Sequence, residues 1–549
     1  MSDETENSGG EGPDPAAMTP AQMKAAVEAR AQAEAAELAK KGGGGNGHGE
    51  IDYKFLKGCL GCNELGDGLL FAAIHRDRFV FNASGQQWMR YTGHHWETDI
   101  EDRSLGAVED AAGRYLTMLP VIAKKLERYV SDKDKCKRLE KTQGKILKRV
   151  NRLRSERGRK SCLKLSASNQ QAPLVTTADT FDLNTWLLPC RNSVIDLRLG
   201  EPAKSIPQDM LLKATAAEWR GIDHPCPTWE RTLVEIFERD EELIGYLHRL
   251  LGYCITGQIF EHVLPIWTGK GRNGKGTIAE VMMHVMGELA KPIQAEMLLD
   301  QGRSRSAAAP SPDIMALKGL RCSFASESDE NRKFSMSRVK WLTGGDQLTG
   351  RWPNDKFPTC FVPTHKLILL TNDLPHAPAG DFAFWERVHV VPFGLQFVNR
   401  EPAAETERRA DLGLRERLEG EASGILAWLV RGCLEWQRIG LAPPEKVRAA
   451  IQRYRQEEDI LQDWIDDRCT LDKYAETPAS KLYANFADWW FKNVTPNRKK
   501  VPSQHVFGRW LTKKFKREKK GTYVYYGIDC DLIDENECQS SVFGPTDGR

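Results

Sequence analysis

A glycine-rich run offers the clearest chemistry in the chain. It reads Gly-Lys-Gly-Arg-Asn-Gly-Lys-Gly-Thr at positions 269–277. The Gly-x4-Gly-Lys spacing is typical of a phosphate-binding loop, in which glycines let backbone N–H groups converge on phosphates and the lysine neutralises them. We therefore predict ATP and Mg²⁺ as cofactors. The residues expected to bind the nucleotide are Gly269, Gly271, Asn273, Gly274, Lys275, Gly276 and Thr277.

The position after the loop lysine departs from the usual motif. A Ser or Thr normally stands there and contacts Mg²⁺, but this chain has Gly276 followed by Thr277. Either Thr277 supplies the magnesium contact through a slightly shifted backbone, or water and an acidic group hold the metal. The sequence leaves both interpretations open.

A phosphoryl-transfer site also needs an acidic group on a neighbouring strand. Glu327 ends the apolar run 320–327, with Asp329 and Glu330 just beyond it. Because Glu327 stands at the strand end, we assign it the principal acidic role and expect it to bind Mg²⁺ together with Thr277.

Two further strand ends carry polar residues. Asn372 follows the apolar run 367–370 and would hydrogen-bond the γ-phosphate or the attacking water. Arg387 starts another strand, and its planar, permanently charged fork suits γ-phosphate stabilisation in the same subunit or a neighbour. The residues expected to be catalytic are Lys275, Glu327, Asn372 and Arg387.

A sheet must position these residues. The short apolar run 262–268 enters the glycine-rich turn, and residues 277–286 continue with helical spacing. Further strand candidates are 320–325, 366–370 and 388–392, with helical stretches between them. Alternation of this kind predicts an α/β fold.

Composition places the chain among globular proteins. Its 549 residues are 40% hydrophobic and 28% charged, which suggests three or four domains, and a net charge of +2 excludes no partner. No apolar run reaches membrane-spanning length, and the polar N-terminus is unlike a targeting peptide, so we expect no membrane partner and a cytoplasmic location, in a bacterial host.

Thirteen scattered cysteines indicate reduced thiols, and Cys59-x-x-Cys62 lacks the second pair that zinc requires.

The domain organisation follows from shifts in composition and pattern. We expect a disordered tail at 1–50, an N-terminal domain with a basic helical segment at 51–225, an ATPase domain with its preceding helices at 226–442, a winged-helix-like α+β domain at 443–533 and a polar tail at 534–549.

Two segments are strongly basic. Residues 121–164 hold 17 Lys and Arg against five acids, and residues 492–520 hold 11 against one. The first is either a solvated helix face or a contact with phosphates. The second resembles the helix and hairpin of a winged helix, and it predicts DNA contact. The candidates there are Arg509, Lys513 and Lys514.

The order of the motifs resembles that of superfamily 3 helicases of phages, plasmids and large DNA viruses, in the branch typified by the poxvirus primase-helicase. The resemblance covers roughly residues 67–531. The stretches that carry it are 269–277, 339–346, 371–375 and 385–393, supported by 192–197, 250–253 and 423–428.

The resemblance implies an AAA+-type P-loop ATPase core that assembles as a homo-oligomeric ring, usually a hexamer, with ATP at subunit interfaces. On the matching positions, Lys275 is the Walker A lysine, Glu327 the Walker B acid, Asn372 the sensor and Arg387 the finger that reaches the neighbour's site. The family often has two adjacent basic residues at the last motif, whereas Glu386 precedes Arg387 here.

The family also carries a DNA-contacting hairpin in the ring channel, between the Walker B acid and the sensor. Residues 348–358 have strand flanks and a Pro-Asn-Asp turn that suit this role. The basic candidates for phosphate contact are Arg351, Lys356 and Lys340. Trp352 or Phe357 would stack on a base or pack internally.

These inferences predict an ATP-dependent, ring-forming DNA helicase, 3′→5′ by the family's expectation, in the replication of a phage, plasmid or other mobile element. A single strand would occupy the channel, and a duplex or fork the basic C-terminal domain. A separate primase or polymerase is the expected partner, because too few residues precede the helical region for the primase domain of relatives.

The alternative is an ATP-binding origin-recognition or loading platform without processive unwinding, which Gly276 keeps open. The basic C-terminal region disfavours a small-molecule kinase.

Overall fold

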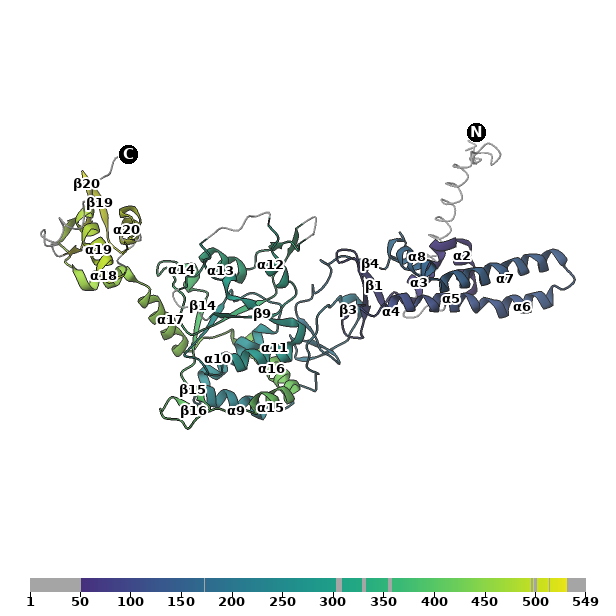
Figure 1. Cartoon of the computed structure of the whole chain (residues 1–549), viewed down its shortest axis with the longest axis horizontal. Helices are drawn as coiled ribbons and strands as arrows, with labels where there is room; N and C mark the ends of the chain where they lie inside the picture. Colours follow the sequence, from purple (N-terminus) through teal and green to yellow (C-terminus); the bar gives the residue numbers. More distant parts are fainter. Residues whose placement is uncertain are drawn as a thin grey trace, which may run out of the picture. The chain divides into compact units, whose positions relative to one another are not determined.

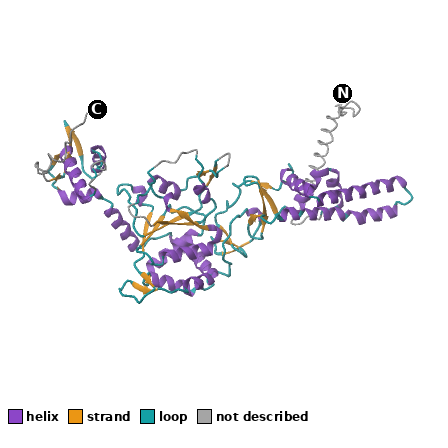
Figure 2. Cartoon of the chain, viewed as in Figure 1, coloured by secondary structure: helices purple, strands orange, loops and turns teal. Residues whose placement is uncertain are grey.

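The structure is a computed structural model, and it describes residues 51–530 apart from 172, 303–308, 328–331, 354–357, 495–496, 498–500 and 513. The tails expected at 1–50 and 534–549 lie outside the described residues. The chain forms two compact units, Met1–Asp196 with Pro202–Thr215, and Leu197–Glu201 with Ala216–Arg549. Helices and strands occur in both (Figure 2), so the mixed α/β class is confirmed. No helix of the described part combines the length and apolar character needed to cross a membrane.

The boundary between the units differs from the sequence prediction of 225. The backbone N–H groups of Ala216 and Ala217 both donate to the carbonyl of Val285, at 3.1 and 3.2 Å, and fix the chain to the second unit from this point. The segment from Leu197 also belongs there, because the Gln437 amide donates to the Leu197 carbonyl at 2.8 Å. The N-terminal domain predicted at 51–225 is therefore too long at its end.

Helices dominate the first unit (Figure 1). α3 packs against α8, and α5 against α7, around a core that contains Phe71, Tyr115 and Ile146. The helices are α2 (Tyr53–Gly61), α3 (Asn63–His75), α4 (Arg103–Gly106), α5 (Val108–Leu116), α6 (Met118–Arg128), α7 (Lys133–Arg154), α8 (Glu156–Ser168) and the 3₁₀ turn η2 (Pro207–Asp209).

A buried ion pair joins three of these helices. The carboxylate of Asp67 on α3 accepts hydrogen bonds from Arg149 of α7 at 2.7 Å and from the Tyr115 hydroxyl of α5 at 3.0 Å. The Asp67 side chain is only 3% exposed and that of Arg149 11%. Burial raises the pKa of Asp67, and the Arg149 charge opposes this rise. The pair therefore depends on both partners being present.

A small sheet with the order β3-β2-β1-β4 completes the first unit. β1 pairs antiparallel with β2 and parallel with β4. The strands of the unit are β1 (Phe79–Asn82), β2 (Gln87–Tyr91), β3 (Trp96–Thr98), β4 (Val175–Thr176), β5 (Leu187–Pro189) and β6 (Val194–Asp196), with β7 (Glu201–Ala203) following at the unit boundary.

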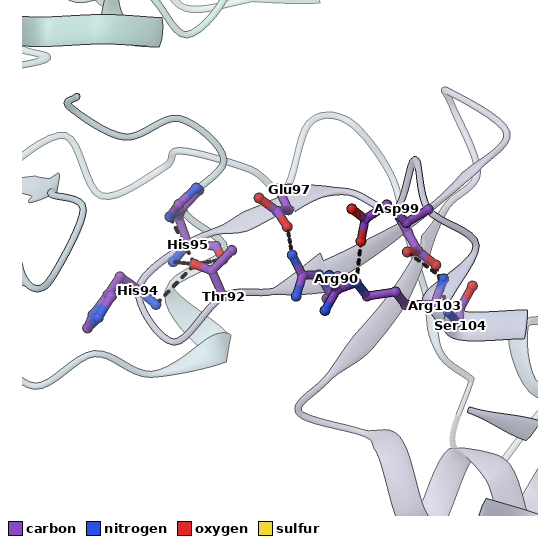
Figure 3. A network of polar contacts seen from close by, with 9 residues as sticks. Arg90, Thr92, His94, His95, Glu97, Asp99, Arg103 and Ser104 are labelled. Carbon is purple, nitrogen blue, oxygen red and sulfur yellow. Dashed lines mark hydrogen bonds and ion pairs between the residues drawn. The ribbon is translucent and has the colours of Figure 1, made fainter. Parts of the chain in front are cut away.

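Polar contacts fix the β2–β3 hairpin (Figure 3). Arg90 pairs with Glu97 across the two strands. The Thr92 hydroxyl donates to the His95 carbonyl at 2.9 Å and closes the turn. Asp99 accepts from the first two backbone amides of α4 at 2.9 and 2.7 Å. These contacts account for the local geometry without an external ligand.

A parallel five-stranded sheet with the order β14-β8-β13-β10-β9 forms the centre of the second unit. Every residue of β13 is buried, as expected for a strand that is covered on both faces. The strands are β8 (Leu264–Thr268), β9 (Ala290–Gln294), β10 (Cys322–Glu327), β13 (Lys366–Thr371) and β14 (Val388–Pro392).

Helices cover both faces of this sheet. Alternate residues such as Ile266, Leu369 and Val390 pack with side chains of α13, α14 and α17. Figure 1 shows α10, α11 and α16 on the other side, where α10 packs against α16. The helices are α9 (Pro227–Ile236), α10 (Glu241–Cys254), α11 (Lys275–Met286), α12 (Pro312–Ala316), α13 (Met336–Thr343), α14 (Phe382–Trp385), α15 (Leu414–Gly420), α16 (Ala422–Ile439) and α17 (Glu445–Glu457), with 3₁₀ turns η3 (Gly287–Leu289) and η4 (Ala295–Met297).

Two short strand pairs extend from this part. β11 (Leu348–Gly350) and β12 (Thr359–Phe361) are antiparallel, so the hairpin expected from the sequence has its strand flanks, while its tip at 354–357 lies outside the described residues. β15 (Gln396–Val398) and β16 (Glu407–Arg409) pair in parallel.

α17 belongs to the core of the central sheet. Its Tyr454 is buried in that core, and the Tyr454 hydroxyl donates to the Pro375 carbonyl. Glu458, just beyond the helix, accepts from the Ala377 amide at 2.9 Å. The C-terminal domain expected from residue 443 therefore begins too early, because the apolar face of α17 completes the core beside β14.

The C-terminal part combines three helices with a three-stranded antiparallel sheet of order β18-β20-β19. Trp464, Phe486, Phe507 and Tyr525 lie in its core. Its elements are α18 (Ile460–Arg468), β17 (Cys469–Thr470), β18 (Glu476–Pro478), α19 (Ala479–Asn493), α20 (Gln504–Leu511), β19 (Arg517–Lys520), β20 (Thr522–Tyr526) and β21 (Asp529–Cys530).

The Asp67–Arg149 pair gives a stability prediction. Arg149→Met leaves the Asp67 carboxylate buried without its counter-charge, which costs about 3 kcal/mol. We expect hydrogen-exchange protection of the α3 and α7 amides to fall by about 100-fold, measured by mass spectrometry at pH 7. The double variant Asp67→Asn/Arg149→Met removes both charges and should lose much less. Equal losses in the two variants would contradict a charge-based role.

Candidate nucleotide-binding site

The loop between β8 and α11 requires glycine at two positions. Gly269 has a φ of +150° and Gly274 a φ of +90°, values that other residues rarely adopt. A Cβ on Gly269 would lie 2.3 Å from the Phe393 carbonyl oxygen, and one on Gly274 would lie 2.5 Å from Ile236 Cδ1. Backbone conformation and close packing both exclude a side chain, so the loop keeps its shape only with these glycines.

The N-terminus of α11 faces the same loop. The first intrahelical bond runs from the Ile278 N–H to the Gly274 carbonyl at 3.0 Å, so the amides of Lys275, Gly276 and Thr277 precede the helical ladder. The Lys275 amide lies 3.5 Å from the Asn273 side-chain oxygen. A helix start with unbonded amides attracts anions, because the helix dipole is positive there.

Lys275 is buried, with 6% of its surface exposed. Its ammonium group donates to the carbonyl of Gly269, to the carbonyl of Thr371 at 2.9 Å and to the side-chain oxygen of Asn372 at 3.4 Å. All three acceptors are neutral, and no carboxylate of the described residues forms an ion pair with this lysine. Burial lowers the pKa of Lys275 to about 8, and the nearby Asp373 partly opposes the shift. A buried cation that has no carboxylate partner among the described residues fits a phosphate group.

The carboxyl ends of three strands meet beside this lysine. Thr268 of β8 is in register with Thr371 of β13, and Thr371 is in register with Glu327 of β10. Since adjacent strands lie about 4.8 Å apart, the backbone of Glu327 stands about 10 Å from that of Thr268. The structure therefore brings Lys275 and Asn372 together and ends β10 at the same edge. The Glu327 side chain, Asp329 and Glu330 lie outside the described part of the chain.

Arg387 lies at the opposite edge of the sheet. Its carbonyl accepts from the Leu264 amide at 2.7 Å, at the start of β8, whereas the loop follows Thr268 at the end of that strand. Five strand residues separate Arg387 from the level of the loop, about 16 Å at 3.3 Å per residue. Its guanidinium donates to the Ala383 carbonyl at 2.5 Å, and its buried Nε has no partner among the described residues. Arg387 therefore does not reach the loop of its own chain.

A cavity of about 380 Å³ lies beside the loop, within the usual size range of small-ligand pockets. Most of its lining could not be predicted from the sequence, because no motif marks the residues that α9 and the segment 397–414 contribute. They come together only in the folded chain. The lining residues are Thr232, Glu235, Ile236, Arg272, Gly274, Thr277, Phe397, Asn399, Arg409, Ala410, Asp411 and Leu414.

An ion pair holds the far wall of this cavity. Arg400 binds both oxygens of Glu407, at 2.8 and 2.5 Å, and the Ala403 amide donates to the same carboxylate at 2.7 Å. These bonds lower the pKa of Glu407 to about 2, so the contact persists at neutral pH. It fixes the turn between β15 and β16 and thereby places Asn399 and Arg409.

Metal binding here would rest on Thr277 and Glu327. Thr277 lines the cavity next to the loop, and a Cβ on Gly276 would meet nothing within 4 Å. The described residues contain no cluster of three His, Cys, Asp or Glu side chains that could hold a metal. A hydroxyl and a strand-end carboxylate are hard oxygen ligands, and these suit Mg²⁺ bound mainly through phosphates and water.

The residues expected to contact DNA differ in their surroundings. Lys340 forms an ion pair with Asp381 at 2.8 Å, and Lys514 pairs with Asp459 at 2.8 Å. Arg509 is exposed on α20. Arg351 directly follows β11 and is half-buried beside the exposed Trp352. Lys356, Phe357 and Lys513 lie outside the described residues.

Comparisons with known proteins identify relatives over part of the chain. Residues 68–238 match the family described as D5 N terminal like. The Acanthamoeba polyphaga mimivirus protein named "Putative helicase L207/L206" is 28% identical over 334 residues, 58% of this chain and 34% of that protein. The Frog virus 3 protein named "Putative helicase 022R" is 27% identical over 276 residues, 49% of this chain and 28% of that protein. The chain thus spans about a third of the length of these relatives.

Among solved structures, the C-terminal region of NrS-1 is 15% identical, with a TM-score of 0.32, and the match covers 57% of this chain and 73% of that chain. A TM-score of this size carries no argument about fold or function. The sequence relatives establish that the chain is related to proteins of large DNA viruses that are named as helicases.

The magnesium contact gives a rescue prediction. If Thr277 supplies the hydroxyl, Thr277→Ala should raise the Mg²⁺ concentration needed for half-maximal ATP hydrolysis by about tenfold, the loss of one metal contact. Gly276→Ser adds a hydroxyl at the usual metal position, on a Cβ that would meet nothing within 4 Å. The double variant should therefore recover a low Mg²⁺ requirement in a steady-state ATPase titration. An unchanged requirement in Thr277→Ala would assign the metal to water and carboxylate.

The lowered pKa of Lys275 gives a pH prediction. Above pH 8 the ammonium of the nucleotide-free protein loses its proton, while a bound phosphate favours the charged form. Affinity for a non-hydrolysable ATP analogue should therefore weaken about tenfold between pH 7 and pH 9. Lys275→Arg is the matched control, because arginine stays charged and its profile should remain flat. Parallel profiles for the two proteins would contradict titration of Lys275.

Proposed function

We propose that the chain is an ATP-dependent DNA helicase of superfamily 3 with an AAA+-type P-loop ATPase core. The position of Lys275 carries the proposal. Its ammonium is buried among neutral oxygens at the carboxyl ends of β8 and β13, beside a glycine loop and a helix N-terminus. This combination favours a polyphosphate over any neutral ligand.

The strand order supports the same conclusion. β8, the first strand of the sheet in chain order, lies between β13 and the last strand, β14. Connections therefore leave β8 toward different parts of the sheet. In open α/β sheets, ligands bind outside the carboxyl ends of strands at such a reversal of strand order. The glycine loop stands at this point.

The chemistry that we propose is hydrolysis of the terminal phosphate of ATP. Lys275 exchanges its carbonyl acceptors for phosphate oxygens, and Asn372 orients the γ-phosphate or the attacking water. Glu327 accepts the proton of that water. Thr277 and Glu327 would hold Mg²⁺, which would neutralise charge on the phosphates. Preorganised positive charge around the transferring group provides most of the rate acceleration.

The cavity beside the loop would hold the nucleoside. Ile236 and Phe397 offer apolar surfaces for the faces of a base, and Asn399 and Asp411 offer hydrogen-bonding groups. Thr277 borders both the cavity and the loop, so one molecule can occupy the two together.

The position of Arg387 supports the proposal that several copies of the chain assemble. Because it lies about 16 Å from the loop of its own chain along β14, it can stabilise a γ-phosphate only in a neighbouring copy. A ring, and a hexamer as the resemblance implies, places each arginine at the next subunit's nucleotide. The site is therefore complete only at a subunit interface.

DNA would contact the β11–β12 hairpin and the C-terminal part. Arg351 adjoins the hairpin, and the order α18, β18, α19, α20, β19 and β20 is that of a winged helix with Arg509 exposed on its third helix. Lys340 and Lys514 are held in ion pairs and contribute less to this proposal. Translocation would be 3′→5′, in replication of a phage, plasmid or other mobile element.

Unwinding gives the first test of the proposal. On forked DNA with ATP and Mg²⁺, displacement should require a 3′ tail and disappear in Lys275→Ala. If wild-type protein binds ATP and DNA but displaces a strand from neither the 3′-tailed nor the 5′-tailed fork, the chain is instead a loading or origin-recognition platform. Gly276 at the usual metal position favours that second candidate.

Complementation tests the shared site. Lys275→Ala and Arg387→Ala should each lower ATP hydrolysis by about 10³-fold, the range for loss of an arginine finger. Mixing the two inactive variants creates interfaces with an intact lysine from one copy and an intact arginine from the other. Hydrolysis should then recover to a substantial fraction of the wild-type rate. A mixture as inactive as its components would place the function of Arg387 within one chain.

A further inference from the structure

Two sets of basic residues on α7 differ in their partners. Near the base of α7, arginines pair with acids of other helices, such as Arg149 with Asp67 and Arg154 with Glu109. Their charge is therefore used within the first unit. The other group lies farther from this base and is exposed: Lys137, Arg138, Lys141, Lys145 and Lys148. None of these five forms an ion pair with the described residues.

The exposed group forms a stripe on one face of α7. At 100° per residue, Lys137, Lys141, Lys145 and Lys148 fall within an arc of about 80°. The buried residues Ile146, Val150 and Leu153 lie on the opposite face. The stripe therefore points away from the core of the unit, and it extends about 16 Å along the helix axis.

Two features indicate that the stripe is not explained by the fold. Lysines four residues apart repel one another, and this destabilises the helix. Gly144 lies beside the stripe in mid-helix, where glycine is unfavourable, yet a Cβ there would meet nothing within 4 Å. Within the described part of the chain, the stripe forms no ion pair and Gly144 meets no packing constraint, while a backbone without a side chain allows close approach of a partner.

The second basic segment is different. In residues 492–520, Lys492, Lys514, Lys516 and Lys520 each pair with a carboxylate of the C-terminal part. The sequence shows similar excess charge in both segments, but the stripe on α7 is less neutralised. Among the described residues, it is thus the stronger electrostatic candidate for a polyanion.

We propose that the α7 stripe, defined as Lys137, Lys141, Lys145 and Lys148, binds the phosphate backbone of DNA. Figure 1 shows α7 beside α6 as a long helical pair. A length of about 16 Å matches the axial rise of about five base pairs. Lysine ammonium groups neutralise phosphates without reading bases, so the contact is independent of sequence. This site goes beyond the proposed function and does not require ATP hydrolysis.

Charge reversal tests the site in the full-length protein without nucleotide. Lys141→Glu/Lys145→Glu/Lys148→Glu should bind a labelled 30-mer about tenfold or more weakly in fluorescence anisotropy at 100 mM salt. The slope of log affinity against log salt should fall by about 0.9 per lost phosphate contact on duplex and about 0.7 on single strand. Separate duplex and single-strand arms therefore show which form of the backbone occupies the stripe.

Three exposed residues elsewhere in the first unit provide the matched control. Lys54→Glu/Lys57→Glu/Arg76→Glu makes the same change in net charge on α2 and at the end of α3, outside the α7 stripe, and should leave affinity and slope unchanged. The conservative Lys141→Arg/Lys145→Arg/Lys148→Arg should bind as wild type does. Hydrogen exchange of α7 shows that each variant is folded.

Wild-type affinity and salt slope in the folded stripe variant would overturn the proposal and point to a non-nucleic-acid partner. Equal losses in the stripe variant and the matched control would also overturn it, because net charge alone would then explain the effect. Failure of strand displacement in the unwinding assay would leave these binding results unaffected.

Discussion

The nucleotide site proposed for the second unit depends on a buried ammonium group that forms no ion pair with the described residues. Lys275 sits at the end of the central sheet, and within the described part of the chain its ammonium donates to oxygens of Gly269, Thr371 and Asn372. Three hydrogen-bond acceptors stabilise this charge. They do not fully compensate for its burial, which lowers the pKa of Lys275. The parallel strands bring these acceptors together, since their carboxyl ends share one edge. The glycines keep the loop close enough for the lysine to turn back onto it.

The same parallel sheet separates the two halves of the proposed chemistry. Lys275 and Asn372 lie at the carboxyl edge, whereas Arg387 precedes β14 at the amino edge. No side-chain rotation closes a gap of about five strand residues, roughly 16 Å. A second copy is therefore part of the proposed site. This explains why a positively charged residue can be conspicuous in the sequence and still play no part in the site of its own chain.

Whether a basic residue of this protein is available to bind phosphate depends on whether an acidic residue already pairs with it. Lys340 and Lys514 stand in regions where the sequence suggests DNA contact, yet Asp381 and Asp459 hold them in ion pairs. On α7, by contrast, the lysines of the stripe face away from the core and form no ion pair with the described residues. Exposed pairs contribute little to stability, but they change which cations remain available to phosphates. The ion pairs therefore show which basic residues serve the fold and which remain free to bind phosphate.

The sequence by itself determined the glycine loop, the strand that precedes Asn372, the strand that follows Arg387, the mixed α/β class and the strand flanks of the hairpin. These features rest on local chemistry: glycine conformations, apolar runs of strand length and polar residues at strand ends. Only the tertiary structure decided that α17 completes the central core, that Phe397 and Asn399 share a cavity with α9, and that Arg387 lies at the far edge of the sheet. Those facts arise from contacts between residues far apart in the chain, and no local pattern encodes which distant side chain will become a neighbour.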